Sequence, residues 1–268
     1  MNELEKPKKR SRLRQILGKE YYILKRKIDW HFGNKKWAKE CTDNFGGTAV
    51  FEHRSLILRP LKEVDMYLQE NKRTNLQLAI VHLDKIVIQP GETFSIWRLV
   101  GRPSKRKGYL EGLVLKEGKT GKDTGGGLCQ LGNLLFWIFA HSPLTITERY
   151  RHGYDVFPGV NRKVPFGAGA TLSYNHIDLQ VKNETSQPFQ LHLWLDDTHL
   201  NGALWSAEPL KETYSVVERS HKMSQQFWGG YSRHNQIVQV IKDKATGKER
   251  EQLLVENHAI MMYNPFLE

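Results

Sequence analysis

The spacing of apolar residues predicts two helices of different character. Over residues 12–28, apolar side chains recur three and four positions apart, as in an amphipathic helix; they are Leu13, Ile16, Leu17, Tyr21, Leu24 and Ile28. Lysine and arginine occupy much of the remaining surface of this helix. Residues 128–139 are strongly apolar, and Pro143 follows them where a proline would stop a helix. We expect this second helix to be buried at the centre of the fold.

Short apolar runs elsewhere predict strands. Residues 85–88 and 93–97 flank Pro90-Gly91, a dipeptide that favours a type II turn. The runs after the central helix cover residues 145–152, 170–174, 177–182, 189–195, 214–219, 237–242 and 252–257. Residues 183–188 and 245–248 lie between successive runs and suit hairpins. We therefore predict an α+β fold, with a mostly antiparallel sheet packed on the central helix and a basic amphipathic helix at the N-terminus.

Other segments are predicted to be less regular. Residues 33–60 and 101–127 are expected to be largely irregular, with one short strand at residues 113–115. Thr74 or Asn75 is expected to cap a short helix whose apolar face comprises Leu76, Ala79, Ile80 and Leu83. No repeat of about 20 to 50 residues recurs, which argues against a repeat architecture.

Positive charge is concentrated at the N-terminus. The net charge is +11, and residues 1–40 hold 13 lysines and arginines against five acidic residues, which leaves +3 for the rest. We expect the basic helix to rest on an anionic membrane surface; the alternative is that it packs its apolar stripe on the main domain. No DNA- or RNA-binding motif accompanies the basic segment, so we expect no nucleic-acid partner.

The same features bear on localisation and domain organisation. No apolar run approaches the roughly 18 residues of a transmembrane helix, and the N-terminus lacks the apolar stretch and cleavage site of a secretory signal. Cys41 and Cys129 are expected to be free thiols in a reducing compartment. We therefore expect a cytoplasmic protein, peripheral at the inner face of the cell membrane. It would comprise a basic helical segment (1–40) and an α+β domain (41–268).

Three consecutive glycines mark the first candidate site. Gly125, Gly126 and Gly127 immediately precede Leu128 and Cys129 at the predicted start of the central helix. Glycine accepts positive φ angles, and the positive end of a helix dipole lowers the pKa of a cysteine in the first turn. Cys129 is therefore the candidate nucleophile. One alternative is a small buried hydrophobe at this position; another is a glycine cradle for phosphate, although the Gly-Lys-Ser/Thr ending of a P-loop is absent.

A cysteine nucleophile needs a base, and His152 is the candidate. It ends the strand-like run that follows the central helix, and we expect this strand to return the imidazole to Cys129. Asp178, or else Asp155, would orient the imidazole. Gln130 follows the cysteine directly and would donate a hydrogen bond to an oxyanion.

The candidate substrate-binding residues surround this centre. They are Gly125, Gly126, Gly127, Asn133, Arg149 and Tyr154. Asn133 lies four positions after Cys129 and so shares its helix face. The alternatives are that the amide is a surface or capping group and that the aromatic residues fill the core. No Cys-x-x-Cys or His-x-x-x-His pair gives metal-ligand spacing, so we expect no metal and no cofactor.

Several blocks of the sequence resemble the VanW family of bacterial cell-envelope proteins. They cover residues 67–72, 90–97, 125–131, 148–152, 165–171 and 177–183. The resemblance spans about residues 45–195, and residues 196–268 would form a β-rich C-terminal extension. Longer relatives carry further domains before this region, so the chain resembles the short form. They also tend to carry an aspartate where this chain has Gly169, so any role of that carboxylate is absent here.

The resemblance implies a setting in the cell envelope and in vancomycin resistance, and it implies no particular reaction. We put forward two hypotheses. In the first, the protein is a Cys-dependent acyl transferase or amide hydrolase that acts on a peptidoglycan-related substrate, with Cys129 as nucleophile and His152 as base. In the second, it is a noncatalytic module that binds a cell-wall peptide, such as a peptidoglycan precursor, or assembles with a partner protein. A thiol of ordinary reactivity, without a nearby imidazole, would favour the second.

Overall fold

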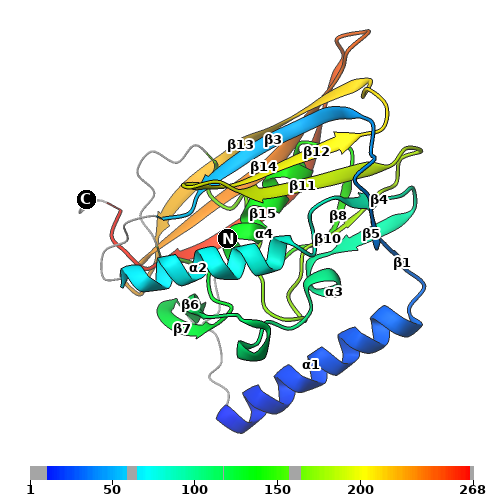
Figure 1. Ribbon diagram of the computed structural model, residues 1–268. Helices are drawn as coiled ribbons and strands as arrows, with labels where there is room; N and C mark the ends of the chain where they lie inside the picture. Colours follow the sequence, from blue (N-terminus) through cyan, green and yellow to red (C-terminus); the bar gives the residue numbers. More distant parts are fainter. Residues whose placement is uncertain (1–10, 59–64, 117, 157–163, 266–268) are drawn as a thin grey trace.

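The computed structural model describes residues 11–58, 65–116, 118–156 and 164–265, and it confirms the α+β class (Figure 1). The described residues form four α-helices: α1 (Arg12–Phe32), α2 (Met66–Ile80), α3 (Ile96–Val100) and α4 (Cys129–Ala140). A short 3₁₀ helix, η1 (Lys105–Lys107), follows α3.

The strands form three sheets and a separate hairpin. The first sheet has the order β1 (Lys36–Trp37), β5 (Glu92–Ser95), β10 (Gln180–Lys182), β8 (Thr145–Glu148). The second has the order β2 (Glu40–Cys41), β4 (Ile86–Ile88), β11 (Phe189–Leu195), β12 (His199–Ser206), β3 (Thr48–Leu56). The third has the order β13 (Glu212–Gln225), β14 (Tyr231–Asp243), β15 (Glu249–Met261), β9 (Tyr154–Asp155), and the hairpin pairs β6 (Glu111–Lys116) with β7 (Lys119–Thr124). Among the described strands, the pairs β1–β5 and β9–β15 are parallel and the others are antiparallel.

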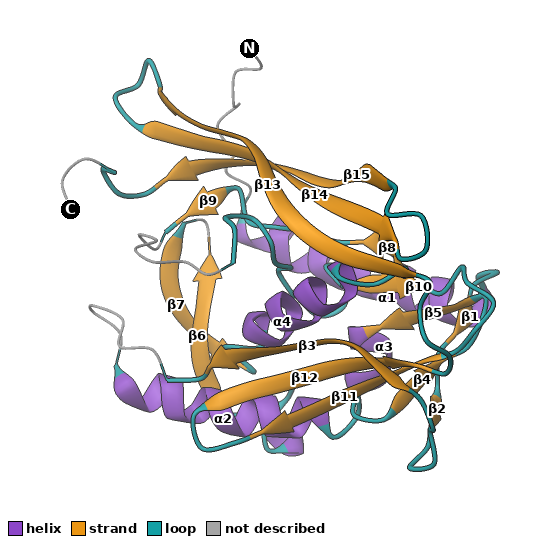
Figure 2. Ribbon diagram, turned by 90° about the horizontal axis from the view of Figure 1, so that it is seen from above, coloured by secondary structure: helices purple, strands orange, loops and turns teal. Residues whose placement is uncertain are grey.

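The apolar helix α4 lies between the second and third sheets (Figure 2). Nine of its 12 residues are buried, because a helix that is apolar on all sides must be enclosed. Gly202 lets β12 approach the helix closely, since a side chain there would come within 2.7 Å of Ile138. On the other side, Gln239 of β14 donates hydrogen bonds to the carbonyls of Ala140 and Ser142. The C-terminal strands therefore belong to the same core as α4.

Two segments that were expected to be irregular form strands instead. β3 is a nine-residue strand that pairs along β12, and residues 119–124 form the second strand of the β6–β7 hairpin. Conversely, the strand predicted to end at Trp97 turns into α3 at Ile96. Ser95 causes this change, because its side chain accepts a hydrogen bond from the Arg98 N–H and caps the helix.

The structure also tests the predictions for one helix and two turns. α2 begins at Met66, earlier than predicted, so Asn75 lies buried within the helix and does not cap it. Residues 245–248 form the predicted hairpin turn between β14 and β15. Residues 183–188 connect strands of different sheets, so the hairpin predicted there is wrong.

The predicted N-terminal helix is confirmed as α1, which packs on the domain with an unexpected face. Ile23 and Trp30 are buried, whereas the apolar stripe is exposed, as Leu17 and Leu24 illustrate. The alternative in which this stripe packs on the domain is therefore wrong. Figure 1 shows α1 along one edge of the molecule, beside α3. No helix of the described ranges has the length and apolar character needed to cross a bilayer.

Candidate functional site

Residues 125–130, here called the glycine–cysteine segment, form a tight turn followed by the start of α4. Gly125 and Gly127 have φ angles of 77° and 92°, which only glycine adopts without strain. Gly126 was expected to need a positive φ as well, but the reason for glycine there is different. A side chain on Gly126 would lie 2.1 Å from the carbonyl carbon of Gly112, so the close approach of two backbones requires glycine.

The polar groups of this turn are used within the protein. Asn75 of α2 donates to the carbonyls of Gly126 (2.9 Å) and Leu110 (3.1 Å), and its carbonyl oxygen accepts from the Leu110 N–H. The N–H groups of Gly125 and Gly126 donate to the carbonyls of Leu110 and Asp123. Since these two N–H groups already have partners, they do not offer the donors that a phosphate cradle needs.

Cys129 lies in the first turn of α4, as predicted, but its environment differs from the expected one. Its sulfur contacts the carbonyl oxygen of Leu172 at 3.8 Å. Burial raises the pKa of the thiol, whereas a helix N-terminus was expected to lower it. Because desolvation disfavours a thiolate, the neutral thiol is favoured although Cys129 is partly exposed to solvent.

The predicted partners of Cys129 form hydrogen bonds with other groups. Among the described residues, no hydrogen bond joins Cys129 to His152. The backbone N–H of His152 donates to the Thr171 hydroxyl, and burial lowers the pKa of its imidazole. Asp155 accepts a hydrogen bond from Tyr263 and lies 3.6 Å from Arg233. Among the described residues, hydrogen bonds therefore do not link Cys129 to His152 or His152 to Asp178.

The side chains that were predicted to form the oxyanion site and to bind substrate contact neighbouring segments of the protein. The Gln130 amide donates to the Ser55 hydroxyl and the Leu56 carbonyl, which joins α4 to β3. Asn133 accepts from the Ala170 N–H. The Arg149 guanidinium donates to the carbonyls of Gly167 and Gly169 and to Asn257, and burial lowers its pKa to about 10. Tyr154 lies in β9, where its ring faces Gly118.

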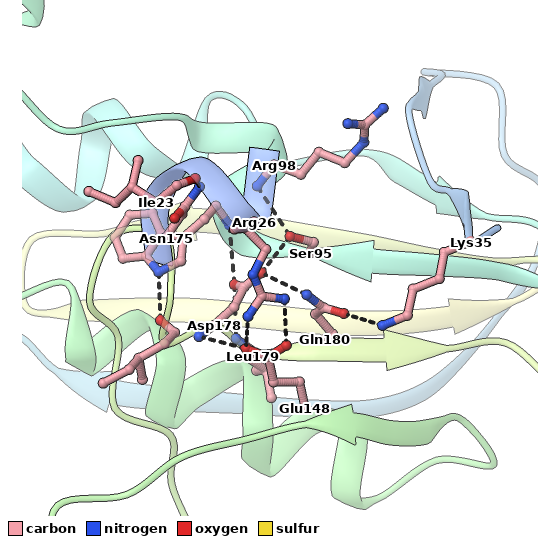
Figure 3. Close-up of polar contacts among 12 residues, drawn as sticks. Ile23, Arg26, Lys35, Ser95, Arg98, Glu148, Asn175, Asp178, Leu179 and Gln180 are labelled. Carbon is pink, nitrogen blue, oxygen red and sulfur yellow. Dashed lines mark hydrogen bonds and ion pairs between the residues drawn. The ribbon is translucent and has the colours of Figure 1, made fainter. Parts of the chain in front are cut away.

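A second group of polar residues, here called the carboxylate cluster, lies beneath α1. It consists of Arg26, Ser95, Glu148 and Asp178, and Figure 3 shows them converging from α1, β5, β8 and the segment just before β10. The Arg26 guanidinium donates to both carboxylate oxygens of Glu148, at 2.6 and 2.7 Å. Glu148 also accepts from the backbone N–H of Asp178 at 3.2 Å.

Asp178 is the most deeply buried charged group of this cluster. One carboxylate oxygen accepts from the Ser95 hydroxyl at 2.5 Å, and the other accepts from the backbone N–H groups of Trp97 and Leu179. The pKa of this carboxyl is raised to about 7, mainly by burial and also by the neighbouring Glu148, against lowering by the Ser95 hydrogen bond. A carboxyl whose pKa is shifted by burial and a charged neighbour is typical of functional sites and of structural ion-pair networks alike.

The edge of the carboxylate cluster is partly open. Gln180 lies 3.5 Å from Asp178 and accepts a hydrogen bond from Lys35 at 2.8 Å. The side chains of Arg26 and Glu148 keep exposures of 16% and 26%, because β8 is an edge strand of the first sheet. Part of the Glu148 side chain is therefore exposed to solvent, whereas Asp178 is buried.

The sequence predicted Asp178 as a site residue with His152 as its partner, but it did not predict Arg26, Ser95 or Glu148. Two signals were present. Ser95, Glu148 and Asp178 each lie in a block that carries the family resemblance, and Asp178 interrupts the apolar run of residues 177–179. A carboxylate within a strand-like apolar run needs buried hydrogen-bond donors. Arg26 gave no such signal, since it is one of many basic residues on its helix.

Two pockets lie away from both groups. One of about 310 Å³ is lined by His192, Trp194 and Trp205 among other residues, on the second sheet. Another of about 280 Å³ includes His141 and Tyr214. Neither is lined by the glycine–cysteine segment or by the carboxylate cluster.

Comparison with known proteins places the chain in a family. The sequence model of a family described as VanW like protein matches residues 71–205. The chain is 41% identical over 167 residues to the vancomycin B-type resistance protein VanW of Enterococcus faecalis. The aligned region covers 62% of this chain and 61% of that relative. It is 32% identical over 119 residues to the uncharacterized protein YoaR of Bacillus subtilis, covering 44% of this chain and 38% of that relative.

These relatives are longer than the regions that they share with this chain. The match spans about three fifths of the first relative and less than two fifths of the second. No solved structure matches the chain. Because the family model covers half of the sequence, the chain belongs to the VanW family.

Proposed function

We propose that this chain works at the cell envelope, in the setting of vancomycin resistance, as a noncatalytic module that binds a cell-wall peptide through a cationic group. The setting comes from kinship with a vancomycin B-type resistance protein. The mode of action comes from the carboxylate cluster, where Glu148 holds the guanidinium of Arg26. This contact is the observation that carries the proposal.

The Arg26–Glu148 contact defines a binding position for a cation. Two parallel hydrogen bonds to one carboxylate form the strongest arrangement for a guanidinium, and an ammonium group can bind the same oxygens. Arg26 belongs to α1, outside the sheet that carries Glu148. A stem peptide of peptidoglycan carries a diamino acid whose free amine is a cation. Such an amine would compete with Arg26 for Glu148.

The rival function, acyl transfer or amide hydrolysis by Cys129, needs a reactive thiolate beside a base. Burial raises the pKa of the Cys129 thiol, and among the described residues its hydrogen-bond partner is the Leu172 carbonyl. A neutral thiol is a poor nucleophile. These features favour the binding module over the enzyme.

Calorimetric titration with a synthetic stem peptide tests the proposal. The peptide with its free side-chain amine should bind, and the same peptide with that amine acetylated should not. Arg26→Ala should strengthen binding because it removes the internal competitor, and Glu148→Gln should abolish it. Trp194→Ala, in the pocket on the second sheet, is the matched control and should bind like the wild type.

Three outcomes would overturn this function. Equal binding of the acetylated peptide would show that no cation is recognised. Full binding by Glu148→Gln, with loss in Trp194→Ala, would move the site to the other pocket. Cleavage or transfer of the peptide that disappears in Cys129→Ala would establish the enzyme instead.

A further inference from the structure

Helix α1 has apolar residues on two sides, and only one side packs on the domain. Ile23 and Trp30 face the domain and are 4% and 8% exposed. Arg26 lies on the same side and pairs with Glu148. These contacts fix which way the rest of the helix points.

The other side of α1 presents a continuous apolar stripe to solvent. Its members recur every three or four residues: Leu13, Leu17, Tyr21, Leu24, Ile28 and Phe32. Their exposed fractions range from 49% for Ile28 to 83% for Phe32. This spacing keeps them in one row along a helix of 21 residues, which is about 31 Å long. An exposed apolar row of this length usually marks an interaction surface.

Basic side chains flank the stripe. Arg14, Lys25 and Lys27 are exposed on α1, which holds six lysines and arginines against two acidic residues. One of the two acidic residues, Glu20, already pairs with Arg102. The basic residues 105–107 of η1 are exposed in the loop that follows Arg102. The surface around the stripe is therefore positively charged.

We propose that this stripe is a docking surface for a bilayer of anionic phospholipids, with α1 lying in the plane of the interface. The apolar side chains would enter the boundary of the acyl chains, and the flanking lysines and arginines would meet lipid phosphates. Pairing with a second copy of α1 is disfavoured, because it would bring the same basic flanks together. This inference does not require the proposed peptide binding, although both involve Arg26.

Vesicle sedimentation of the full chain tests the surface. Binding to vesicles of phosphatidylglycerol and phosphatidylcholine should exceed binding to phosphatidylcholine alone, and salt should weaken it. Leu17→Glu and Leu24→Glu should each weaken binding about tenfold or more, because each replaces a leucine that the bilayer would bury by a charged residue. Both side chains are exposed in the free protein, so folding should be unaffected.

Leu253→Glu is the matched control, since Leu253 is a leucine of similar exposure on β15, 54% against 59% for Leu24. It should bind vesicles like the wild type. Equal binding to neutral and anionic vesicles would overturn the proposal, and so would wild-type binding by Leu24→Glu. Absence of vesicle binding, together with a dimer that Leu24→Glu dissociates, would replace the bilayer by a second copy of the chain.

Discussion

The glycine–cysteine segment and the carboxylate cluster contain the most reactive residue types of the chain, yet they use their polar groups differently. In the glycine–cysteine segment, backbone groups pair with Asn75 and with neighbouring carbonyls, and the thiol is neutral. In the carboxylate cluster, two carboxyl groups lie side by side and a guanidinium from another segment meets one of them. A reactive residue type therefore says less about function than the charges and burial around it.

The largest expected effect comes from Gly126→Val, which would disrupt the packing of the glycine–cysteine segment against the Gly112 backbone. Its side chain would meet the Gly112 backbone at 2.1 Å, and backbone cannot move aside cheaply. We expect the free energy of unfolding to fall by about 3 kcal/mol or more, as measured by urea denaturation. Gly121→Val on β7 is the control, because the added Cβ would make only an ordinary contact of 3.8 Å with the Val114 side chain. Equal losses in both variants would contradict the account.

The two regions also differ in how far the sequence could predict them. The positions of α1 and α4 followed from apolar periodicity, and Cys129 was correctly placed in a first turn. β3 was missed because Glu52 and Arg54 interrupt its apolar pattern on the exposed side. The pairing of Arg26 with Glu148 spans 122 positions, and no local pattern specifies such a contact.

The next effect in size concerns Arg26→Ala, which leaves Glu148 beside the buried Asp178 without its counterion. Breaking a largely enclosed ion pair strands the remaining charge, so we expect a loss of about 2 kcal/mol in the free energy of unfolding. Arg102→Ala is the control, since the Arg102–Glu20 pair also ties α1 to the domain but both side chains are 54% exposed. It should cost less than about 1 kcal/mol. Similar losses of unfolding free energy in the two variants would show that the Arg26–Glu148 pair stabilises the fold no more than the exposed Arg102–Glu20 pair does.

A smaller, pH-dependent effect should come from Asp178→Asn. The pKa of Asp178 is raised from 3.8 to about 7 in the folded protein, so the folded state binds a proton that the unfolded chain releases. This contribution to stability is present below pH 3.8 and is lost as the pH rises through about 7. Relative to Asp178→Asn, the wild type should therefore lose stability as the pH rises through that window.

Denaturation curves across this pH range measure the difference. Glu148→Gln should move the upper end of the window to lower pH, because the neighbouring carboxylate helps to raise the Asp178 pKa. Parallel pH profiles for the wild type and Asp178→Asn would contradict the assignment of a raised pKa to Asp178.

The central claim is that Cys129 is a structural thiol and not a nucleophile, and its alkylation rate tests this most directly. Cys41 is exposed and serves as the internal reference. With iodoacetamide and peptide mapping of the native protein across pH, Cys41 should be modified first at every pH, and His152→Ala should leave the Cys129 rate unchanged. Faster modification of Cys129 at neutral pH, with that advantage lost in His152→Ala, would contradict the account and restore the enzymatic hypothesis.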